Sequence, residues 1–382
     1  MTMADAKHVM IVAGEASGDQ HAAYLVENIR RQAPNVRVSG IGGHHMREAG
    51  VEVLVDSSEL AVVGLVEPLL HFRTIYGALQ LMRRRLREER PDLLILTDYP
   101  DFNLRLARTA KELGIKVLYY ISPQVWAWRQ KRVFKIKELV DMMAVVFAFE
   151  VPFYEKAGVP VRFVGHPLVD EVGSELSRDA AVSALGLDPT RKVLGLFPGS
   201  RRSELKRLLP TLLQSAALLH RRFPELQFVL PRASTLSKAQ LAPYLEGSTL
   251  PISVVEGRFY DTVQACDAIV TASGTATLEI ALMGKPLAVI YRVSPMSYRI
   301  MSRLIKVDHI ALCNIVAGKR AARELIQDDA TPEAIAEEAS RLLEENDYAE
   351  QVRKDLRDVR KNLGDGGGSR NIANLALEML EP

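Results

Sequence analysis

Short apolar runs alternate with helical patterns along the first half of the chain. The apolar run at residues 8–13 is followed by a helical pattern at residues 22–32, and such a pair is typical of one strand–helix unit. Because helical patterns separate most of the later apolar runs, the sequence predicts a parallel, doubly wound sheet. The further strands of this half are expected at residues 36–39, 93–96, 116–120, 143–147 and 161–164.

The alternation pauses between residues 166 and 191 and then begins again. A polar helical stretch precedes a new apolar run at residues 193–197, so we place a domain boundary near residue 170. Later strands are expected at residues 226–230, 252–255, 268–271 and 287–290, and charged helices at residues 333–346, 348–362 and from about Arg370. The sequence thus predicts an α/β protein with two Rossmann-like domains, residues 1–170 and 171–345, and C-terminal helices at residues 346–382.

Length and charge narrow the classes of protein. A chain of 382 residues exceeds what one hydrophobic core usually serves, which agrees with two domains. The 49 basic and 47 acidic residues give a net charge of +2, so no overall basic field indicates a nucleic-acid partner. The chain has only two cysteines, Cys266 and Cys313, which are too few for a disulfide framework, and no pair of Cys or His residues has zinc-ligand spacing. Residues 1–13 do not resemble a secretion signal, and we expect a cytoplasmic protein.

A glycine-containing loop, Gly14-Glu15-Ala16-Ser17-Gly18-Asp19, lies between the first expected strand and helix. Glycine permits a tight turn, and helix N–H groups at such a position can face a ligand. The spacing is not the dinucleotide fingerprint, and no ribose-binding acid follows the second strand, which argues against a nicotinamide site. The pattern fits a structural turn and a ligand loop equally well, with Glu15 and Asp19 as the polar candidates.

Asp98 follows the apolar run at residues 93–97. It should lie at the carboxyl end of a buried parallel strand, where doubly wound sheets bind their ligands. A helix cap is the structural alternative, but Asp101 or Asn103 suits that role better. We therefore interpret Asp98 as a functional carboxylate.

The segment after the next strand, residues 122–129, contains both tryptophans of the chain, Trp126 and Trp128. Flat rings beside Gln124 and Arg129 suit a sugar or acyl surface, and they suit packing anchors under a loop equally well.

Two strand-to-helix turns of the second half have the composition of phosphate sites. Gly199, Ser200, Arg201 and Arg202 follow the strand at residues 193–197 and open a helix. Glycine allows close approach, the helix start supplies N–H donors, and arginine adds charged hydrogen bonds. An exposed arginine pair is often only solvated, but its place at this turn favours an anion site.

The second turn, Ser273-Gly274-Thr275-Ala276-Thr277, follows the strand at residues 268–271 and should direct N–H groups at a diphosphate. Helix capping explains Ser273 and Thr275 but not Glu279, which lies about one helical turn further on in an apolar helix. A carboxylate there can accept both hydroxyls of a ribose, so we expect a nucleotide at this turn.

Between residues 60 and 86, apolar positions recur at nearly helical spacing among arginines. This pattern resembles an interfacial helix, whereas Glu67, Pro68 and His71 interrupt it too often for a membrane span. A core-facing helix is the alternative. The apolar positions are Leu69, Phe72, Tyr76, Leu79 and Leu86, and the arginines are Arg73, Arg83, Arg84, Arg85 and Arg87.

Six segments, in this order along the chain, resemble the motifs of the lipid-A-disaccharide synthases. They are GEASGD at residues 14–19, TDYPDFN at 97–103, SPQVWAW at 122–128, VGHPL at 164–168, LFPGSR at 196–201 and ASGTATLE at 272–279. Each is weak alone, but the ordered set is specific. The segment after Gly318 and the tail are less diagnostic.

The resemblance implies the GT-B fold, in which two Rossmann-like domains face a central cleft. It implies transfer of 2,3-diacylglucosamine from UDP to the 6-hydroxyl of 2,3-diacylglucosamine 1-phosphate, with inversion, giving a β-1,6-linked lipid A disaccharide and UDP. The family acts without metal or cofactor at the inner face of the inner membrane of Gram-negative bacteria. It is described as a homodimer with exchanged C-terminal segments, which would place Asn314 near a partner's cleft.

On this basis we expect Asp98 to be the general base, with Glu15 as the second candidate. The alternatives are an enzyme like the UDP-N-acetylglucosamine 2-epimerases, and a nucleotide-sugar or lipid-binding protein without turnover. The expected substrate-binding residues are Gly14, Ser17, Gly199, Ser200, Arg201, Arg202, Ser273, Gly274, Thr275, Ala276, Thr277, Glu279 and Asn314.

Overall fold

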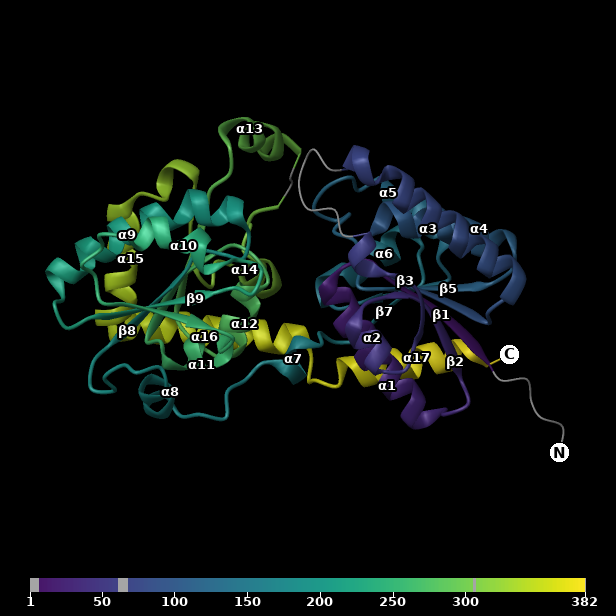
Figure 1. Cartoon of the computed structure of the whole chain (residues 1–382), viewed down its shortest axis with the longest axis horizontal. Helices are drawn as coiled ribbons and strands as arrows, with labels where there is room; N and C mark the ends of the chain where they lie inside the picture. Colours follow the sequence, from purple (N-terminus) through teal and green to yellow (C-terminus); the bar gives the residue numbers. More distant parts are fainter. Residues whose placement is uncertain (1–6, 61–67, 305–306, 382) are drawn as a thin grey trace. The chain divides into compact units, whose positions relative to one another are not determined.

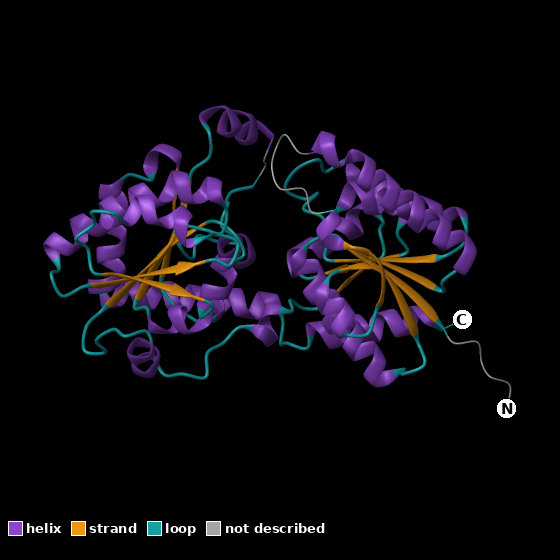
Figure 2. Ribbon diagram, in the orientation of Figure 1, coloured by secondary structure: helices purple, strands orange, loops and turns teal. Residues whose placement is uncertain are grey.

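The computed structural model of the protein describes residues 7–60, 68–304 and 307–381. The chain forms two compact units, Met1–Asp170 with Leu363–Pro382, and Glu171–Asn362. Each unit contains one parallel sheet with helices on both faces (Figure 1, Figure 2). The expected pair of parallel α/β sheets is therefore confirmed.

The sheet of the first unit has the strand order β3-β2-β1-β4-β5-β6-β7. Because the chain order reverses between β1 and β4, the loops after these two strands meet at the carboxyl edge, which is where such sheets bind ligands. The strands are β1 (His8–Ala13), β2 (Arg37–Gly42), β3 (Glu52–Asp56), β4 (Leu93–Thr97), β5 (Lys116–Tyr120), β6 (Met142–Val145) and β7 (Val161–Phe163).

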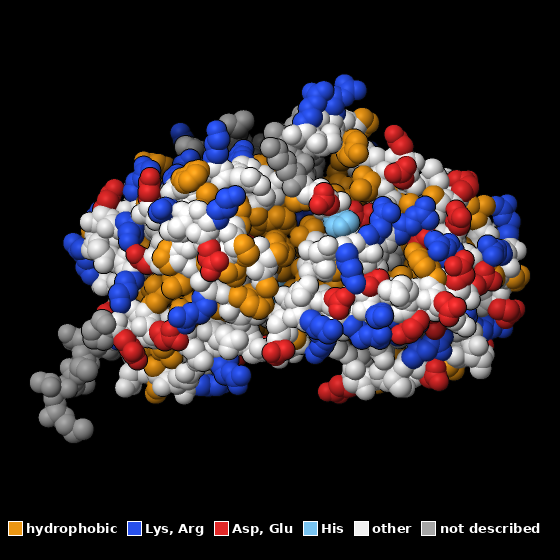
Figure 3. Space-filling model, turned by 180° about the vertical axis from the view of Figure 1, so that it is seen from behind, with side chains coloured by type: hydrophobic (Ala, Val, Ile, Leu, Met, Phe, Trp, Pro, Cys, Tyr) orange, Lys and Arg blue, Asp and Glu red, His pale blue; other side chains and the backbone are white. Residues whose placement is uncertain are grey.

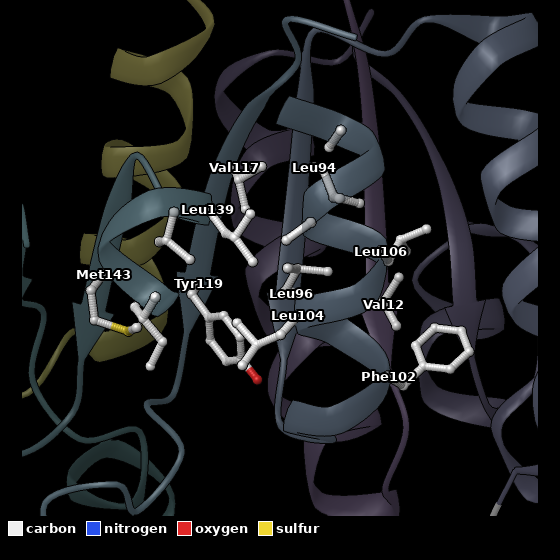
Figure 4. Close-up of a cluster of buried hydrophobic side chains, with 14 of the residues drawn as sticks. Val12, Leu94, Leu96, Phe102, Leu104, Leu106, Val117, Tyr119, Leu139 and Met143 are labelled. Carbon is white, nitrogen blue, oxygen red and sulfur yellow. The ribbon is translucent and has the colours of Figure 1, made fainter. Parts of the chain in front are cut away.

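Helices pack on both faces of this sheet. One face is covered by α1 (Ala16–Gln32), α2 (His44–Glu48) and α17 (Gly368–Leu380), and the other by α3 (Pro68–Glu89), α4 (Pro100–Glu112), α5 (Arg132–Leu139) and α6 (Val151–Ala157). Figure 4 shows α4 on the sheet, with Leu96, Phe102 and Tyr119 among the buried side chains. The loops at the carboxyl edge thus follow strands whose side chains are buried in hydrophobic clusters on both faces of the sheet.

The second unit repeats this plan with the strand order β10-β9-β8-β11-β12-β13. Its order reverses between β8 and β11, so the loops after these two strands meet at the carboxyl edge. The strands are β8 (Val193–Phe197), β9 (Gln227–Arg232), β10 (Ile252–Glu256), β11 (Ala268–Ala272), β12 (Leu287–Tyr291) and β13 (Arg323–Ile326). The helices are α8 (Arg178–Ala184), α9 (Arg202–Arg222), α10 (Lys238–Leu245), α11 (Phe259–Ala265), α12 (Ala276–Leu282), α13 (Pro295–Leu304), α14 (Leu312–Ala317), α15 (Pro332–Glu344) and α16 (Asn346–Leu363), with α7 (Leu168–Glu171) at the boundary between the units.

Two strands, β3 and β13, were not predicted from the sequence. Both lie at the edge of a sheet, and neither is buried throughout its length. An edge strand can therefore contain polar residues, as Glu52 and Arg323 show. The predicted central strands are buried on both faces and read as continuous apolar runs, which is why the pattern indicated them.

The last helix, α17, belongs to the first unit and packs on α1. Its first residue, Gly368, lies so close to Gly165 that a Cβ there would be 2.9 Å from the carbonyl oxygen of Gly165. Asp170 accepts hydrogen bonds from the N–H groups of Gly367 and Gly368, at 2.8 and 3.2 Å. These contacts fix the turn before α17, while exchange of the segment between subunits stays a prediction.

Helix α3 departs from the interfacial pattern over its described side chains. Leu79, Met82 and Leu86 are buried in the core of the first unit, so this part of the apolar stripe faces the sheet, which is the alternative reading. The side chains of Leu69 and Phe72 lie outside the described residues. No helix in the described part of the chain combines the length and apolar composition needed to cross a membrane.

Candidate functional site

Asp98 lies directly after β4, at the carboxyl edge of the first sheet. Its Oδ1 accepts a hydrogen bond from the Gly14 N–H, in the loop after β1, at 3.1 Å. Its Oδ2 is buried and has no hydrogen-bond partner among the described residues. Burial raises the pKa of Asp98 to about 8, and the neighbouring Glu15 charge adds to this increase, whereas the hydrogen bonds from the backbone oppose it. A carboxyl group with this pKa can accept and release a proton near neutral pH.

The backbone at Asp98 is held in a strained conformation. Asp98 and Tyr99 have φ angles of 52° and 37°, in the left-handed region that residues other than glycine rarely adopt. Two buried polar side chains hold this turn, because Tyr119 donates to the Asp98 carbonyl oxygen at 2.6 Å and Asn103 donates to the same oxygen at 2.7 Å. Asn103 therefore supports the turn rather than binding a ligand.

The loop after β1 places two glycines against this turn. A Cβ at Gly18 would lie 1.9 Å from Oδ2 of Asp98, and a Cβ at Gly14 would lie 2.9 Å from the Tyr99 side chain. Only glycine lets the start of α1 approach the carboxylate so closely. Ser17, an expected substrate-binding residue, and Glu15, the second candidate for the base, are exposed beside these glycines, so both are accessible to a substrate.

Asp19, the other polar residue of this loop, has a structural role. It is buried, and its carboxylate accepts hydrogen bonds from the N–H groups of Gly43, His45 and Met46 at 2.5, 3.0 and 3.3 Å. These groups are at the beginning of α2, so Asp19 caps that helix. As a ligand-binding candidate, Asp19 was the wrong interpretation.

The tryptophan loop after β5 covers a buried carboxyl group that the sequence did not indicate. Glu150 is 1% exposed, and burial raises its pKa to about 8, while the side chains of Ser122 and Trp126 lower it. Trp126 packs edge-on against Phe149, with ring centroids 4.9 Å apart. In contrast, Trp128 is exposed and has the Arg129 guanidinium over its ring at 4.5 Å. Trp126 thus packs against a neighbouring ring, whereas Trp128 presents an exposed ring to solvent.

His166, in the VGHPL segment, is a buried histidine of the first unit. Burial lowers its pKa to about 3, with His21 nearby adding to the effect. Its Nδ1 accepts a hydrogen bond from the Leu168 N–H at 3.2 Å. The ring is therefore neutral at physiological pH, and its Nδ1 is engaged in a hydrogen bond within the VGHPL segment.

The second unit contains a cleft at the carboxyl edge of its sheet, between the loops after β8 and β11. Its volume is about 670 Å³, which is in the range of small-molecule sites. Of the expected residues, Gly199, Ser200, Arg201, Ser273, Gly274, Thr275, Ala276 and Glu279 line it. Arg202 is exposed and is not among the lining residues, so its part in the site stays a prediction.

The donor groups of the turn after β8 form hydrogen bonds to a carboxylate of the same turn. Glu204 accepts hydrogen bonds from the N–H groups of Ser200 and Arg201 at 3.0 and 3.1 Å, and from the Arg201 guanidinium at 3.2 Å. Gly199, with a φ of 100°, lets this carboxylate fold back, since a Cβ there would lie 2.3 Å from Glu204 Oε2. The Arg201 side chain is nevertheless 79% exposed. It can reach a ligand in the cleft.

Two lining arginines were missed by the sequence analysis. Arg232, at the end of β9, pairs with Glu256 at the end of β10, and its side chain is only 8% exposed. Arg258 bonds to Asp261 at 3.0 Å and to a backbone carbonyl. Neither arginine belongs to a motif that the sequence analysis singled out. They reach the cleft because neighbouring strands of the folded sheet end beside it.

Glu279 projects from α12 into the cleft. Burial raises its pKa; a hydrogen bond from the Tyr260 hydroxyl at 3.0 Å acts in the opposite direction, and the Glu171 charge adds to the increase. Tyr260, on α11, thus orients the carboxylate and is a further residue that the sequence analysis missed. The Glu279 carboxylate therefore lines the cleft and can accept further hydrogen bonds there.

Thr277 and Asn314 are not among the residues that line the cleft. Thr277 is buried and donates to the Gly274 carbonyl oxygen at 2.8 Å. Asn314 is also buried, and its amide is fully occupied by Ala322 and by Glu324 Oε1, each at 2.8 Å. Both are expected substrate-binding residues, and in the ligand-free structure their polar atoms form hydrogen bonds within the chain.

The described residues contain no cluster of three or more His, Cys, Asp or Glu side chains that could hold a metal ion. Acidic and basic side chains are interspersed on the face shown in Figure 3. The chemistry that this part of the chain offers is therefore two carboxyl groups of raised pKa in the first unit, Asp98 and Glu150, and an arginine-lined cleft with an oriented glutamate in the second.

Comparison with known sequences identifies close relatives. A family model described as lipid-A-disaccharide synthetase matches residues 9–377. The chain is 59% identical over 380 residues to the lipid-A-disaccharide synthase of Geobacter metallireducens, covering 100% of this chain and 99% of that protein. It is 60% identical over 373 residues to the lipid-A-disaccharide synthase of Nitrosococcus oceani, covering 98% and 96%.

Solved structures share the fold at low sequence identity. The UDP-GlcNAc 2-epimerase of Neisseria meningitidis, bound to UDP-GlcNAc, has a TM-score of 0.66 at 14% identity, covering 97% of this chain and 100% of that chain. The calicheamicin glycosyltransferase CalG4 has a TM-score of 0.63 at 18% identity and covers 98% of both chains. The likeness concerns the fold alone, and it confirms the GT-B fold.

Proposed function

The chain belongs to the lipid-A-disaccharide synthase family and is a glycosyltransferase of lipid A synthesis, and from this premise we propose its substrates and mechanism. It transfers 2,3-diacylglucosamine from UDP to the 6-hydroxyl of 2,3-diacylglucosamine 1-phosphate. The observation that most supports this proposal is the second-unit cleft, where exposed Arg201 and the oriented Glu279 carboxylate occur together.

The donor binds in this cleft. Arg201 forms charged hydrogen bonds to the diphosphate. Because Gly274 and Thr275 are exposed, the diphosphate can approach the backbone after β11. Glu279 accepts the ribose hydroxyls, which its hydrogen bond from Tyr260 leaves possible because a carboxylate has four acceptor positions. The same contacts stabilise the negative charge that develops on UDP as it leaves.

The reaction is one displacement at the anomeric carbon. The acceptor 6-hydroxyl oxygen forms a bond to this carbon while the bond to the UDP oxygen breaks, so the configuration inverts. Asp98 takes the hydroxyl proton, since its Oδ2 is not committed to another described residue. Glu15, exposed beside it, is the second candidate.

The assay that tests the function is mass spectrometry of the product from synthetic acylated donor and acceptor. A disaccharide 1-phosphate and UDP are expected in equal amounts, and only when both substrates are present. UDP release without acceptor, or epimerised donor, would instead indicate an enzyme like the 2-epimerases. Binding without any product would leave a nucleotide-sugar-binding protein.

Arg201→Ala should weaken use of the donor far more than use of the acceptor. A charged hydrogen bond to phosphate is worth about 1.5–3 kcal/mol, so the donor kcat/KM should fall about 10- to 150-fold. Arg202→Ala is the matched control, because Arg202 is exposed at the next position but does not line the cleft. Steady-state kinetics with each substrate varied in turn measures both variants. Equal donor kinetics in the two would remove Arg201 from the site.

Turnover should be unaffected by a chelator. The proposed mechanism uses arginine and backbone donors at the diphosphate, and no carboxylate cluster for a hard cation occurs among the described residues. UDP release in EDTA should match the untreated rate. If EDTA abolished activity and magnesium or manganese restored it, the assignment of the leaving-group contacts would have to change.

Membrane association and a homodimer complete the proposal. The substrates are lipids with sugar head groups, so a peripheral position at the inner face of the inner membrane would bring the protein to them. Because Leu79, Met82 and Leu86 are buried in the core, these side chains of α3 do not contact the membrane in this proposal. Light scattering and vesicle cosedimentation test the two statements separately.

A further inference from the structure

An acidic side chain, Glu204, holds the hydrogen-bond donors of the turn at which we expect the diphosphate. Its Oε2 accepts hydrogen bonds from the N–H groups of Ser200 and Arg201 at 3.0 and 3.1 Å. Its Oε1 accepts one from the Arg201 guanidinium at 3.2 Å. Carboxylate and phosphate oxygens are both anionic acceptors that suit such donors, so Glu204 and a diphosphate would use the same three groups.

The Glu204 carboxylate lies in the donor cleft itself. Glu204, Ser200 and Arg201 all line this cleft, and the Glu204 side chain is 20% exposed. A diphosphate that entered with Glu204 in place would set two negative groups side by side, which is strongly unfavourable. The diphosphate therefore either avoids this turn or displaces Glu204.

Helix capping explains only part of the arrangement. Glu204 is the third residue of α9, and an acidic side chain there commonly accepts a hydrogen bond from the backbone N–H of the N-cap residue, here Arg201. Capping does not require the bonds from the Ser200 N–H and from the guanidinium. Glutamine serves at the same position of a capping box, so the charge of Glu204 can be tested apart from the helix.

Arg207 gives Glu204 a second position, away from the turn. It is exposed and lies three residues further along α9, so the two side chains share a face of the helix. Burial and the Glu204 charge raise the pKa of the Tyr291 hydroxyl at the end of β12, while Arg201 and Arg207 lower it. Glu204 and Arg207 thus lie in one neighbourhood, although Arg207 is not among the residues that line the cleft.

We propose that Glu204 is an internal competitor of the donor diphosphate. It holds the donors of the turn while the cleft is empty, turns toward Arg207 when the diphosphate binds, and returns to the turn as UDP leaves. The inference rests on the proposed function in one respect, namely that the diphosphate of UDP binds at this turn. Because the competition weakens the binding of donor and product alike, it limits the affinity for UDP and favours release of the product.

The test is calorimetry of the full chain with UDP and with uridine, which lacks the diphosphate. Glu204→Gln keeps an acceptor for the cap but removes the charge, so the dissociation constant of UDP should fall about five- to tenfold, because charged hydrogen bonds no longer have to be broken. The dissociation constant of uridine should not change. In the assay with synthetic donor and acceptor, UDP should inhibit this variant at a correspondingly lower concentration.

Glu333→Gln is the matched control. Glu333 is an exposed acid in the first turn of another helix, α15, and it does not line the cleft. This variant should keep the wild-type dissociation constants for UDP and for uridine. Tighter UDP binding in this control as well would show a general effect of net charge and would overturn the proposal.

A double-mutant cycle tests the second position of Glu204. Arg207→Ala should raise the dissociation constant of UDP about twofold, which is what an exposed ion pair along a helix contributes, but it should have no effect in the Glu204→Gln background. The same effect in both backgrounds would overturn the transfer to Arg207. Weaker or unchanged UDP binding in Glu204→Gln would overturn the competition and make Glu204 a permanent cap that positions Arg201. Failure of the wild type to bind UDP would instead contradict the proposed function.

Discussion

Asp98→Asn is expected to reduce turnover about 10²- to 10⁴-fold while donor binding changes little. A primary sugar hydroxyl is too weakly acidic to attack efficiently near neutral pH unless a base accepts its proton as the new bond forms. Asn keeps the size of the side chain but cannot take the proton. The measurement is kcat by UDP release, with the dissociation constant of UDP determined separately by calorimetry.

The pH dependence gives an independent check on this role. The pKa of Asp98 is raised to about 8 by burial, and a base must be deprotonated to act. The wild-type kcat/KM should therefore rise with pH up to about 8 and level off above it, and the residual activity of Asp98→Asn should lack this rise. A wild-type profile that is flat from pH 6 to 9 would contradict the assignment.

Stability distinguishes lost chemistry from lost folding. The folded protein holds the Asp98 proton more tightly than the unfolded chain between about pH 4 and pH 8, so this group favours the folded state less as the pH rises through that window. Asn has no such dependence, and the melting temperature of Asp98→Asn should match or exceed that of the wild type above pH 8. If Asp98→Asn keeps its turnover while Glu15→Gln loses it, the base is Glu15.

Gly18→Ala should reduce kcat about 10²-fold, although it adds only one methyl group. That Cβ would lie 1.9 Å from Oδ2 of Asp98, so the carboxylate would have to turn away, and its hydrogen bond from the Gly14 N–H would be strained. A misplacement of about 1 Å at a catalytic group can cost about two orders of magnitude. Initial-rate kinetics at saturating donor and acceptor measures this loss.

Gly77→Ala is the control for this substitution. Gly77 also lies in a helix of the first unit, but a Cβ there would meet no atom within 4 Å. Alanine has the higher helix propensity, so this variant should be active and slightly more stable. Full turnover in Gly18→Ala, with folding confirmed by circular dichroism, would show that the contact with Asp98 has no part in catalysis.

The sequence was informative where local pattern and local structure coincide. The central strands are buried on both faces and therefore read as apolar runs, and the loops that follow β1, β4, β8 and β11 contain the glycines and charges that drew attention to them. Asp98 could be singled out because a carboxylate directly after such a run is costly unless it is used. The edge strands β3 and β13 were not predicted, and neither is buried throughout its length.

The roles of individual polar residues depended on contacts between distant segments. The sequence indicated Asp19 as a candidate ligand-binding residue, but its carboxylate accepts hydrogen bonds from N–H groups at the start of α2. Asn314 looked like a substrate contact, but Glu324 and Ala322 fold around its amide. Hydrogen bonds of this kind join residues that are eight or more positions apart, and no periodicity in the sequence reports them.

The sequence by itself determined that this chain forms two parallel α/β sheets and where their ligand-binding loops fall, because burial on both faces of a central strand leaves a direct record in the residue pattern. Only the tertiary structure decided which groups in those loops remain available. It brought the start of α1 against Asp98, whose burial raises its pKa, placed Arg232 in the lining of the cleft, and put the Tyr260 hydroxyl against Glu279. The physical reason is that availability depends on burial and on competing partners, and both are set by segments that meet only when the chain folds.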